Sequence, residues 1–413
     1  MRKFRNTLYT GDNLYVLHGL DSGLADLIYL DPPFNSKRMY SAPVGSHAAG
    51  ASFKDMWTWK DVDEQFLGAL AIRFPALARY IASVGGIHGK PMMAYLTYMA
   101  QRVIEMHRVL KNTGSLYFHC DPTASHYLKP LLDEIFGKNN FRNEIVWHYR
   151  RWTGKARKFQ ALHDIIYFYT KSDDYTFNPL FTEYTEGSKE RKEQGVLHRF
   201  KRGETPVLVS DKKVDEKGVR ENDVWQIPFV APSARERTGY PTQKPLALLH
   251  RIVKASSNEG DIVLDPFCGC ATTCVAAQQL GRKWIGIDIE KQSVSILVER
   301  LSDDAGLFRD FTATSQLPVR TDIKETEPTQ SVKTRLYKEQ NGKCNACGTG
   351  FDILNLEIDH IIPKAKGGGN HYENYQLLCG SCNRIKGDRP MEYLRMQIET
   401  REKLLKRQIV FGE

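Results

Sequence analysis

Short apolar runs alternate with stretches of helical periodicity through the first half of the chain. Residues 25–31, ADLIYLD, form an apolar run of the length that is typical of a buried strand. Residues 92–110 place apolar side chains at helical spacing, and KNTG then separates them from a second strand-like run, SLYFHC. This alternation of strands and helices favours an α/β domain built in layers.

A polar interval divides this half of the chain from the next. Residues 150–225 carry dense charge of both signs and little apolar periodicity. The pattern at 241–257 then predicts a helix with Pro245 in its first turn. A strand at 261–267, a helix, a strand at 283–289 and a last helix follow, so the alternation resumes after the interval.

The rest of the chain divides into a polar segment and a compact unit that carries cysteines. Residues 303–330 contain Pro, Thr, Asp and Glu, a composition that predicts a linker. We therefore expect three parts: a domain over 1–302, a linker over 303–330 and a small domain over 331–413.

Charge and cysteine content restrict the partners and the compartment. A net charge of +9, from 58 Lys and Arg against 49 Asp and Glu, permits binding to a polyanion, although solubility alone would explain so small an excess. The N-terminus lacks an apolar signal segment, and no run of about 18 apolar residues occurs, so no membrane contact is expected. We expect a cytoplasmic protein whose eight cysteines are thiols or metal ligands rather than disulfides.

The stretch DIVLDPFCGCATT, residues 261–273, predicts a strand that enters a turn of small residues and then a helix. Small residues let the backbone approach a ligand, and a helix N-terminus supplies free N–H groups. Asp288 ends the next strand, roughly twenty residues after Asp265, where an acid can accept hydrogen bonds from ribose hydroxyls. Such turns are common, so this pattern alone indicates a nucleotide site only weakly.

Four motifs taken together resemble the DNA amino-methyltransferases. They are DPPF at 31–34, TQKP at 242–245, DPFCGCATT at 265–273 and GIDI at 286–289. The catalytic motif precedes the cofactor motif, which is the β permutation of that family, and the resemblance covers roughly residues 5–302. It implies a Rossmann-like α/β fold with a seven-stranded, mostly parallel sheet, S-adenosylmethionine as the cofactor and double-stranded DNA as the partner.

The resemblance also assigns the residues around the cofactor. Those expected to line S-adenosylmethionine are Asp265, Phe267 and Gly269, with Asp288 on the ribose, Asp12 on the adenine, and Thr242, Gln243 and Lys244 near the methionine end. The turn of the family usually reads F-x-G-x-G, whereas this chain has Ala271 in place of the second glycine. Because alanine is small, we expect the site to be retained, with a loop that avoids a positive φ at Ala271.

The DPPF corner suits methyl transfer to an exocyclic amine. The lone pair of such an amine is delocalised into the base, and hydrogen bonds from its N–H groups help to localise it. Asp31 and the Pro32 carbonyl would accept these hydrogen bonds, in a corner fixed by Pro32 and Pro33. Phe34 would stack on the base once it is flipped out of the duplex. No covalent nucleophile is needed, which argues against a cytosine-C5 enzyme.

The target base and the region that recognises the DNA sequence are inferred from other features. In this family Asp at the first motif position goes mostly with adenine and Ser with cytosine, so adenine N6 is favoured over cytosine N4. The polar block 150–225 would be the target-recognition region, unless it is only a solvated surface loop. Its side chains suited to phosphates, with one ring that could stack, are Arg150, Arg151, Lys155, Arg157, Lys158 and Trp152.

Two CxxC pairs in the last unit predict one tetrahedral structural zinc site. The pairs are Cys344 with Cys347 and Cys379 with Cys382. Bound Zn²⁺ would contribute folding free energy to a unit too small for a large core.

The residues around and between these pairs resemble the HNH, or ββα-metal, nucleases across 331–389. His360 would be the general base that activates water, and Asp359 would hold a divalent ion such as Mg²⁺. Asn374 matches the middle Asn of the family, which holds the loop that orients the base. Asn383 stands where His is common, and its amide oxygen suits Mg²⁺.

Basic residues follow the second cysteine pair. Arg384, Lys386 and Arg389 are expected to contact the DNA backbone. Residues 391–410 predict a final helix with further cations, some of which would belong to a solvated face: Lys403, Lys406 and Arg407.

These expectations favour a bifunctional enzyme that methylates adenine N6 in DNA and carries an HNH endonuclease or nickase, in restriction–modification or defence. One alternative is an N4-cytosine methyltransferase whose zinc unit only binds DNA. Another keeps both folds but makes RNA the substrate. A homodimer is one possible assembly.

Overall fold

The computed structural model describes residues 5–34, 38–42, 52–55, 73–150, 159–184, 218–305, 311–323, 326–366 and 368–389, with isolated positions between and after them. Several of the predicted DNA-contacting residues lie outside this part of the chain: Arg151, Trp152, Lys155, Lys158, Lys403, Lys406 and Arg407. Arg150 and Arg157 are described, and both are exposed.

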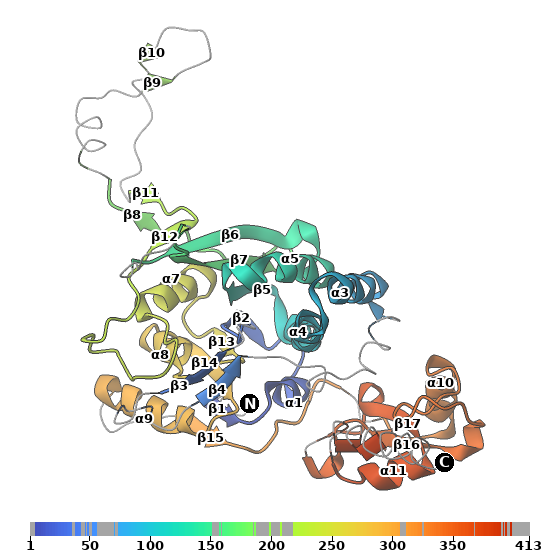
Figure 1. The fold of residues 1–413 in the computed structure, drawn as a ribbon. Helices are drawn as coiled ribbons and strands as arrows, with labels where there is room; N and C mark the ends of the chain where they lie inside the picture. The colour runs from blue at the N-terminus through green and yellow to red at the C-terminus, as the bar shows by residue number, and fades with distance from the viewer. Residues whose placement is uncertain are drawn as a thin grey trace.

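A mixed sheet forms the centre of the larger domain (Figure 1). Within the described residues its nine strands follow the order β12 (Val224–Gln226), β6 (Phe141–His148), β7 (His163–Thr170), β5 (Leu110–Cys120), β2 (Ala25–Leu30), β13 (Ile262–Asp265), β14 (Lys283–Asp288), β1 (Asn6–Thr10) and β15 (Phe311–Thr314). Neighbours run parallel, except that β7 is antiparallel to β5 and β6. The predicted mostly parallel α/β sheet is confirmed, and the short edge strands β12 and β15 extend it beyond the expected seven.

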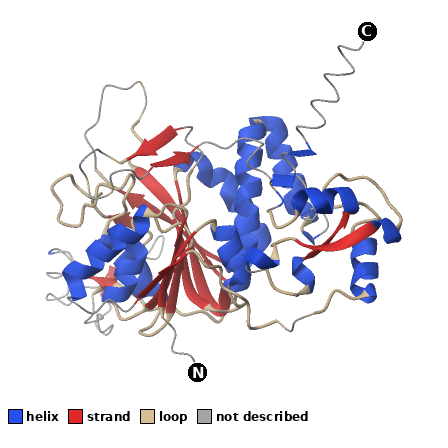
Figure 2. Ribbon diagram, turned by 90° about the horizontal axis from the view of Figure 1, so that it is seen from below, coloured by secondary structure: helices blue, strands red, loops and turns tan. Residues whose placement is uncertain are grey.

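Helices cover both faces of the sheet (Figure 2), and the central strand β2 explains why. Ile28 and Leu30 pack in one core with α1 (Asn13–Gly19), α3 (Pro75–His88), α4 (Lys90–Val109) and α5 (Pro122–Phe136). Leu27 and Tyr29 pack in a second core with α7 (Leu246–Ser256), α8 (Thr272–Gln279) and α9 (Gln292–Ala305). Because both faces of β2 are buried, its side chains form a continuous apolar run rather than an alternating one.

Helix α7 begins later than the apolar pattern predicts. Pro245 is its N-cap rather than part of its first turn. The preceding residues form a turn in which Thr242 has a left-handed φ of 61°. This turn frees the side chains of Gln243 and Lys244 from the helix, and both line the cavity described below.

Part of the predicted linker is ordered against the larger domain. Strand β15 lies within residues 303–330 and pairs with β1 at the edge of the sheet. Farther along, the Thr321 hydroxyl donates to Asp21 at 2.7 Å, and Arg320 donates to the Ser22 hydroxyl at 3.0 Å. The sequence missed this strand because its four residues, FTAT, are too few to show a clear alternation.

The smaller domain is built on one hairpin and two helices (Figure 1). Strands β16 (Leu356–His360) and β17 (Tyr375–Cys379) are antiparallel, and α10 (Gln330–Glu339) and α11 (Gly380–Lys386) flank them. Leu336, Leu356 and Leu377 belong to its compact apolar core.

Three further short pairings occur among the described strands, beside the β16–β17 hairpin: β3 (Arg38–Ser41) with β4 (Ser52–Asp55), β8 (Phe181–Thr182) with β11 (Val219–Arg220), and β9 (His198–Arg199) with β10 (Val207–Leu208). No helix in the described part of the chain has the length and apolar character needed to span a bilayer.

Candidate functional site

A cavity of about 1060 Å³ opens at the carboxyl ends of the central strands, where α/β folds usually bind ligands. Asp31 follows β2, Asp265 ends β13 and Asp288 ends β14. The cavity gathers every residue that the resemblance assigns to methyl transfer and cofactor binding: Asp12, Asp31, Pro32, Pro33, Phe34, Thr242, Gln243, Lys244, Asp265, Phe267, Gly269 and Asp288. Its volume suffices for a cofactor and a base, since ligand pockets usually occupy about 300–1,000 Å³.

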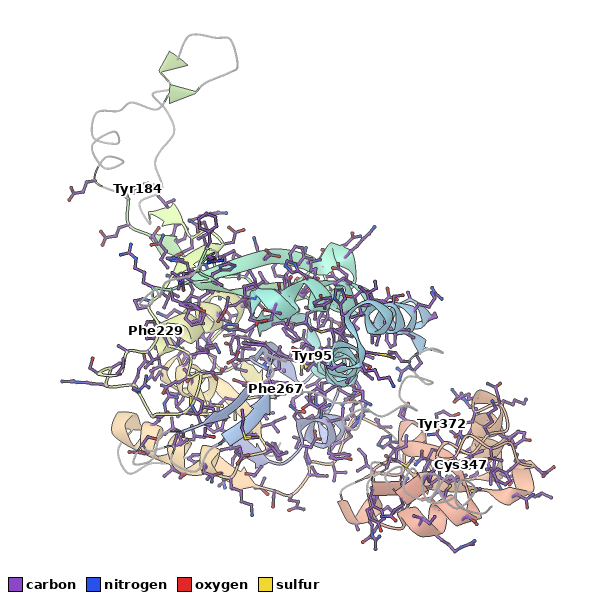
Figure 3. The ribbon with its side chains drawn as sticks, viewed as in Figure 1. Tyr95, Tyr184, Phe229, Phe267, Cys347 and Tyr372 are labelled. Carbon is purple, nitrogen blue, oxygen red and sulfur yellow. The ribbon has the colours of Figure 1, made fainter. Side chains whose placement is uncertain are left out.

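Two carboxylates, the buried Asp265 and the half-buried Asp288, shape the turn on the cofactor side of the cavity. Asp265 accepts a hydrogen bond from the Phe267 amide at 3.0 Å, and Asp288 accepts one from the Gly269 amide at 2.7 Å. Burial raises the pKa of Asp265 to about 7 and that of Asp288 to about 6. Phe267 lies near the middle of the larger domain (Figure 3). The acceptors and the turn therefore fit the hydroxyl-bearing part of a nucleoside cofactor.

The expectation that the loop avoids a positive φ at Ala271 is wrong. This residue has φ 57° and ψ 32°, a left-handed conformation at the N-cap of α8. Its amide donates to the Cys268 carbonyl at 2.6 Å, and its own carbonyl accepts from Val275 at 3.0 Å, so the turn and the helix both require this geometry. A left-handed alanine costs about 1–2 kcal/mol, which these hydrogen bonds and complete burial offset.

Asp12 caps the helix that borders the cavity on another side. Its side chain accepts from the Leu14 amide at 2.9 Å and pairs with Arg102 at 2.8 Å. Arg102 is buried and also donates to the Asn13 side chain at 2.7 Å. Asn13 donates in turn to the Pro266 carbonyl at 2.7 Å, which ties α1 to the cofactor turn. Sequence reasoning missed Arg102, whose position inside a long amphipathic helix gives no separate signal.

Gln243 braces the turn before α7. Its side-chain oxygen accepts from the Thr238 amide at 2.8 Å, and its side-chain nitrogen donates to the Glu236 carbonyl at 2.5 Å. These bonds hold the left-handed turn at Thr242 in place. The three residues expected at the methionine end therefore differ in what they do. Thr242 forms the turn, Gln243 supports its backbone, and Lys244 projects its charge into the cavity.

At the DPPF corner, Lys244 Nζ donates to Asp31 Oδ2 in a short ion pair. Asp31 and Lys244 are 213 positions apart in the chain. Phe34 is half-buried, and its ring stacks on His119 with centroids 6.0 Å apart and planes at 28°. The corner thus presents one carboxylate, one aromatic ring and one ammonium group to the same cavity.

His119 and Asp164 extend the site beneath Asp31, and sequence reasoning missed both. His119 is the penultimate residue of β5, is fully buried, and lies 2.9 Å from the Tyr29 hydroxyl and 3.2 Å from Asp164 Oδ2. Burial alone would raise the pKa of Asp164, but the hydrogen bond and charge of His119 lower it. A polar residue at the end of the strand-like run SLYFHC is the one signal that could have identified His119.

The four cysteines of the CxxC pairs converge in the smaller domain. Their sulfur atoms all lie within 4.8 Å of one another, and three of the four residues are buried, with Cys347 exposed. Cys347 and Tyr372 mark this domain in Figure 3. Four thiols in this arrangement fit a tetrahedral zinc site.

The predicted nuclease residues lie on and beside the β16–β17 hairpin. Asn374 accepts from the Ile362 amide at 2.8 Å and donates to the Ile362 and Gly369 carbonyls at 3.1 Å each. It therefore holds the loop that follows His360. His360 Nε2 lies 2.9 Å from the Asn370 side-chain oxygen.

Both carboxylate oxygens of Asp359 have protein partners. Lys386 Nζ lies 3.1 Å from Oδ1, and Gln376 Nε2 donates to Oδ2 at 2.7 Å. The expected contact of Lys386 with the DNA backbone is wrong, because this lysine is buried with only 1% of its surface exposed. Arg384 and Arg389, in contrast, are exposed.

The expected Mg²⁺ ligands do not form an open oxygen cradle. The described side-chain hydrogen bond of Asn383 is donated to Glu357 at 2.6 Å, rather than to a group on Asp359. Each carboxylate oxygen of Asp359 faces a donor, so a divalent ion at this carboxylate would have to displace Lys386 or share Asp359 with it.

Comparisons with known proteins bear on both domains. Residues 25–299 match the N6_N4_Mtase family model, described as DNA methylase, and residues 344–389 match the model described as HNH endonuclease.

Individual relatives match part of the chain. The type II methyltransferase M.HpaI of Haemophilus parainfluenzae is 33% identical over 215 residues, 52% of this chain and 62% of that protein. The DNA adenine methyltransferase YhdJ of Escherichia coli (strain K12) is 28% identical over 299 residues, 71% of this chain and 82% of that protein. Among solved structures, the PvuII DNA methyltransferase (cytosine-N4-specific) covers 73% of this chain and 88% of its own, with 14% identity and a TM-score of 0.45.

Proposed function

The chain belongs to the N6/N4 DNA methylase family and carries an HNH domain, and we propose that it methylates adenine N6 in DNA and cuts or nicks DNA with its second domain. The observation that carries the first activity is the convergence of Asp31, Asp265 and Asp288 on one cavity. Three strand ends thus supply both the amine acceptor and the cofactor contacts.

In this proposal the corner residues act on a base flipped out of the duplex. Asp31 and the Pro32 carbonyl accept hydrogen bonds from the exocyclic amine, which localises its lone pair and stabilises the cation that develops on nitrogen. Phe34, already stacked on His119, provides the surface for the base. His119 is a positioning residue, because it lies between Tyr29 and Asp164 behind the corner.

S-adenosylmethionine would supply the methyl group as an electrophile. Asp288 would accept hydrogen bonds from its ribose, Asp12 would lie at its adenine, and Phe267 and Gly269 would line the turn beside it. These residues line the same cavity as Asp31, which supports a direct meeting of donor and acceptor without a covalent enzyme intermediate.

Adenine is proposed over cytosine because the corner begins with Asp31, and because one relative is a DNA adenine methyltransferase. Residues 150–225 would include the target-recognition region, with the exposed Arg150 and Arg157 suited to phosphate. We place the protein in the cytoplasm, in restriction–modification or defence, with a homodimer as one possible assembly.

The second domain would act through His360 as general base, held by the loop that Asn374 braces. Zinc is proposed for the four cysteines on the basis of their geometry. A divalent ion such as Mg²⁺ is proposed from the resemblance, and it would have to displace Lys386 or share Asp359 with it.

The target base can be identified directly. DNA treated with the protein and S-adenosylmethionine is digested to nucleosides and analysed by mass spectrometry. N6-methyladenine is expected. If N4-methylcytosine is found instead, the target base is cytosine. If the DNA stays unmodified while RNA treated in the same way is methylated, the substrate is RNA.

A further inference from the structure

Lys244 occupies the oxygen of Asp31 that a ligand in the cavity can reach. Asp31 Oδ1 is buried and has no hydrogen-bond partner among the described residues, with His119 Nδ1 4.0 Å away. Oδ2 is the atom that accepts from Lys244 Nζ. An amine that binds this carboxylate from the cavity therefore needs the oxygen on which the ammonium group now lies.

The ammonium group also lies where an exocyclic amine would lie if its base stacked on Phe34. Lys244 Nζ lies 5.7 Å from the centroid of the Phe34 ring while it contacts Asp31. A base stacked on Phe34 with its exocyclic amine on Asp31 would put a nitrogen in the same space. Both groups are N–H donors, so they compete for one acceptor.

Lys244 is buried, with 9% of its surface exposed, but it has few other polar contacts among the described residues. Its second described hydrogen bond, to the Thr242 carbonyl, is long at 3.3 Å. The residue lies in the turn before α7, and a lysine side chain has a flexible four-carbon stem. The ammonium group can leave Asp31 by rotation of that stem, without a change in the braced backbone at Gln243.

We propose that Lys244 stands in for the amino group of the target base on Asp31 and is exchanged for that group when the base enters the cavity. This role rests on the proposed methyl transfer and deepens it. A base with an exocyclic amine takes the place of the ammonium group on Asp31, whereas a base without one leaves the ammonium group on the carboxylate, so that Asp31 keeps a partner in both complexes. Lys244 thereby sets how strongly the site prefers bases that carry an exocyclic amine.

The test compares two duplexes that differ by one amino group. One carries the sequence that the wild type methylates, and the other has purine in place of the target adenine, or 2-pyrimidinone in place of a target cytosine. Dissociation constants are measured with S-adenosylhomocysteine bound, so that no transfer occurs. The preference is the ratio of the constant without the amine to the constant with it.

Lys244→Met is expected to raise this preference about tenfold, because only the amine can then satisfy Asp31. Lys244→Gln, which is neutral but retains an N–H donor, is expected to fall between Lys244→Met and the wild type. Lys254→Met is the matched control, since Lys254 is exposed on α7, and its preference is expected to equal that of the wild type.

An unchanged or lower preference in Lys244→Met would show that Lys244 only orients Asp31 and would overturn the exchange. If Lys244→Met fails to bind S-adenosylhomocysteine or to fold, the same comparison with Lys244→Gln decides the matter. A wild type that transfers no methyl group to DNA overturns the proposed function itself. An unchanged preference in an active enzyme overturns the role of Lys244 alone.

Discussion

Lys386 Nζ lies 3.1 Å from Oδ1 and 3.0 Å from Oδ2 of Asp359, and both side chains are buried. The same ammonium group donates to the His360 carbonyl at 2.8 Å. These contacts join α11, which contains Cys382 of the second cysteine pair, to the strand that carries His360. A cation expected to face DNA therefore braces the nuclease hairpin.

Lys386→Met should destabilise the smaller domain by about 3–5 kcal/mol, because it leaves the Asp359 carboxylate buried and unpaired. Hydrogen exchange of residues 356–379 in the full chain measures this loss locally. Lys338→Met, at an exposed position of α10, should leave the exchange unchanged. Equal protection in Lys386→Met and the wild type would contradict the bracing role of the pair.

Cys379→Ser should remove the metal from the four-cysteine cluster. We expect about one zinc per chain in the wild type and much less in the variant, because a structural site needs all four ligands. Elemental analysis of the purified protein provides the count. Cys120→Ala, in the core of the larger domain, should retain the zinc. Zinc that survives in Cys379→Ser would place the metal elsewhere.

The raised pKa of Asp265 makes stability depend on pH in a defined direction. Its pKa is about 7 in the folded protein, against about 4 in an unfolded chain. Between these values the folded state keeps a proton that the unfolded chain has lost, so the stabilisation present at low pH is lost as the pH rises to about 7.

The contribution of Asp265 to stability is isolated by comparing the wild type with the Asp265→Asn variant. Relative to Asp265→Asn, the free energy of unfolding of the wild type should fall by on the order of 4 kcal/mol from pH 4 to pH 7. Asp174→Asn, at an exposed carboxylate, should run parallel to the wild type. Urea unfolding at several pH values gives the curves, and a difference that rises with pH would contradict the burial of a protonated Asp265.

The left-handed Ala271 predicts which side chains the cofactor turn accepts. Ala271→Val should weaken binding of S-adenosylhomocysteine by about tenfold or more, because a β-branched residue strongly disfavours positive φ. Ala271→Gly should bind normally, since glycine adopts this conformation readily. Calorimetric titration measures both. Wild-type affinity in Ala271→Val would mean that the turn does not need its observed geometry to hold the ligand.

The convergence of three of the motifs could be predicted from sequence because each lies at the carboxyl end of a strand. DPPF follows β2, DPFCGCATT begins at the last residue of β13 and GIDI covers the end of β14, and the carboxyl ends of neighbouring parallel strands meet at one edge of the sheet. The two CxxC pairs were equally informative, since ligand spacing alone predicts a shared metal site.

Contacts between distant residues could not be read in this way. The partner of Asp31 is 213 positions away, and the partner of Asp359 is a lysine in a run that looks like a DNA-binding segment. Ala271 shows that a local preference can also mislead. Alanine usually avoids a positive φ, but the hydrogen bonds at the N-terminus of α8 impose one here. Such choices depend on tertiary packing, which a single sequence does not contain.

The central claim, that methyl transfer and DNA cutting reside in two separate sites, is tested most directly by one measurement on two variants. Supercoiled plasmid is incubated with each protein, Mg²⁺ and S-adenosylmethionine labelled in its methyl group, and label in the DNA and plasmid topology are recorded from the same sample. Asp31→Ala should lose the label and keep the cutting, and His360→Ala should do the reverse. Labelled DNA from Asp31→Ala, or cutting by His360→Ala, would contradict the account.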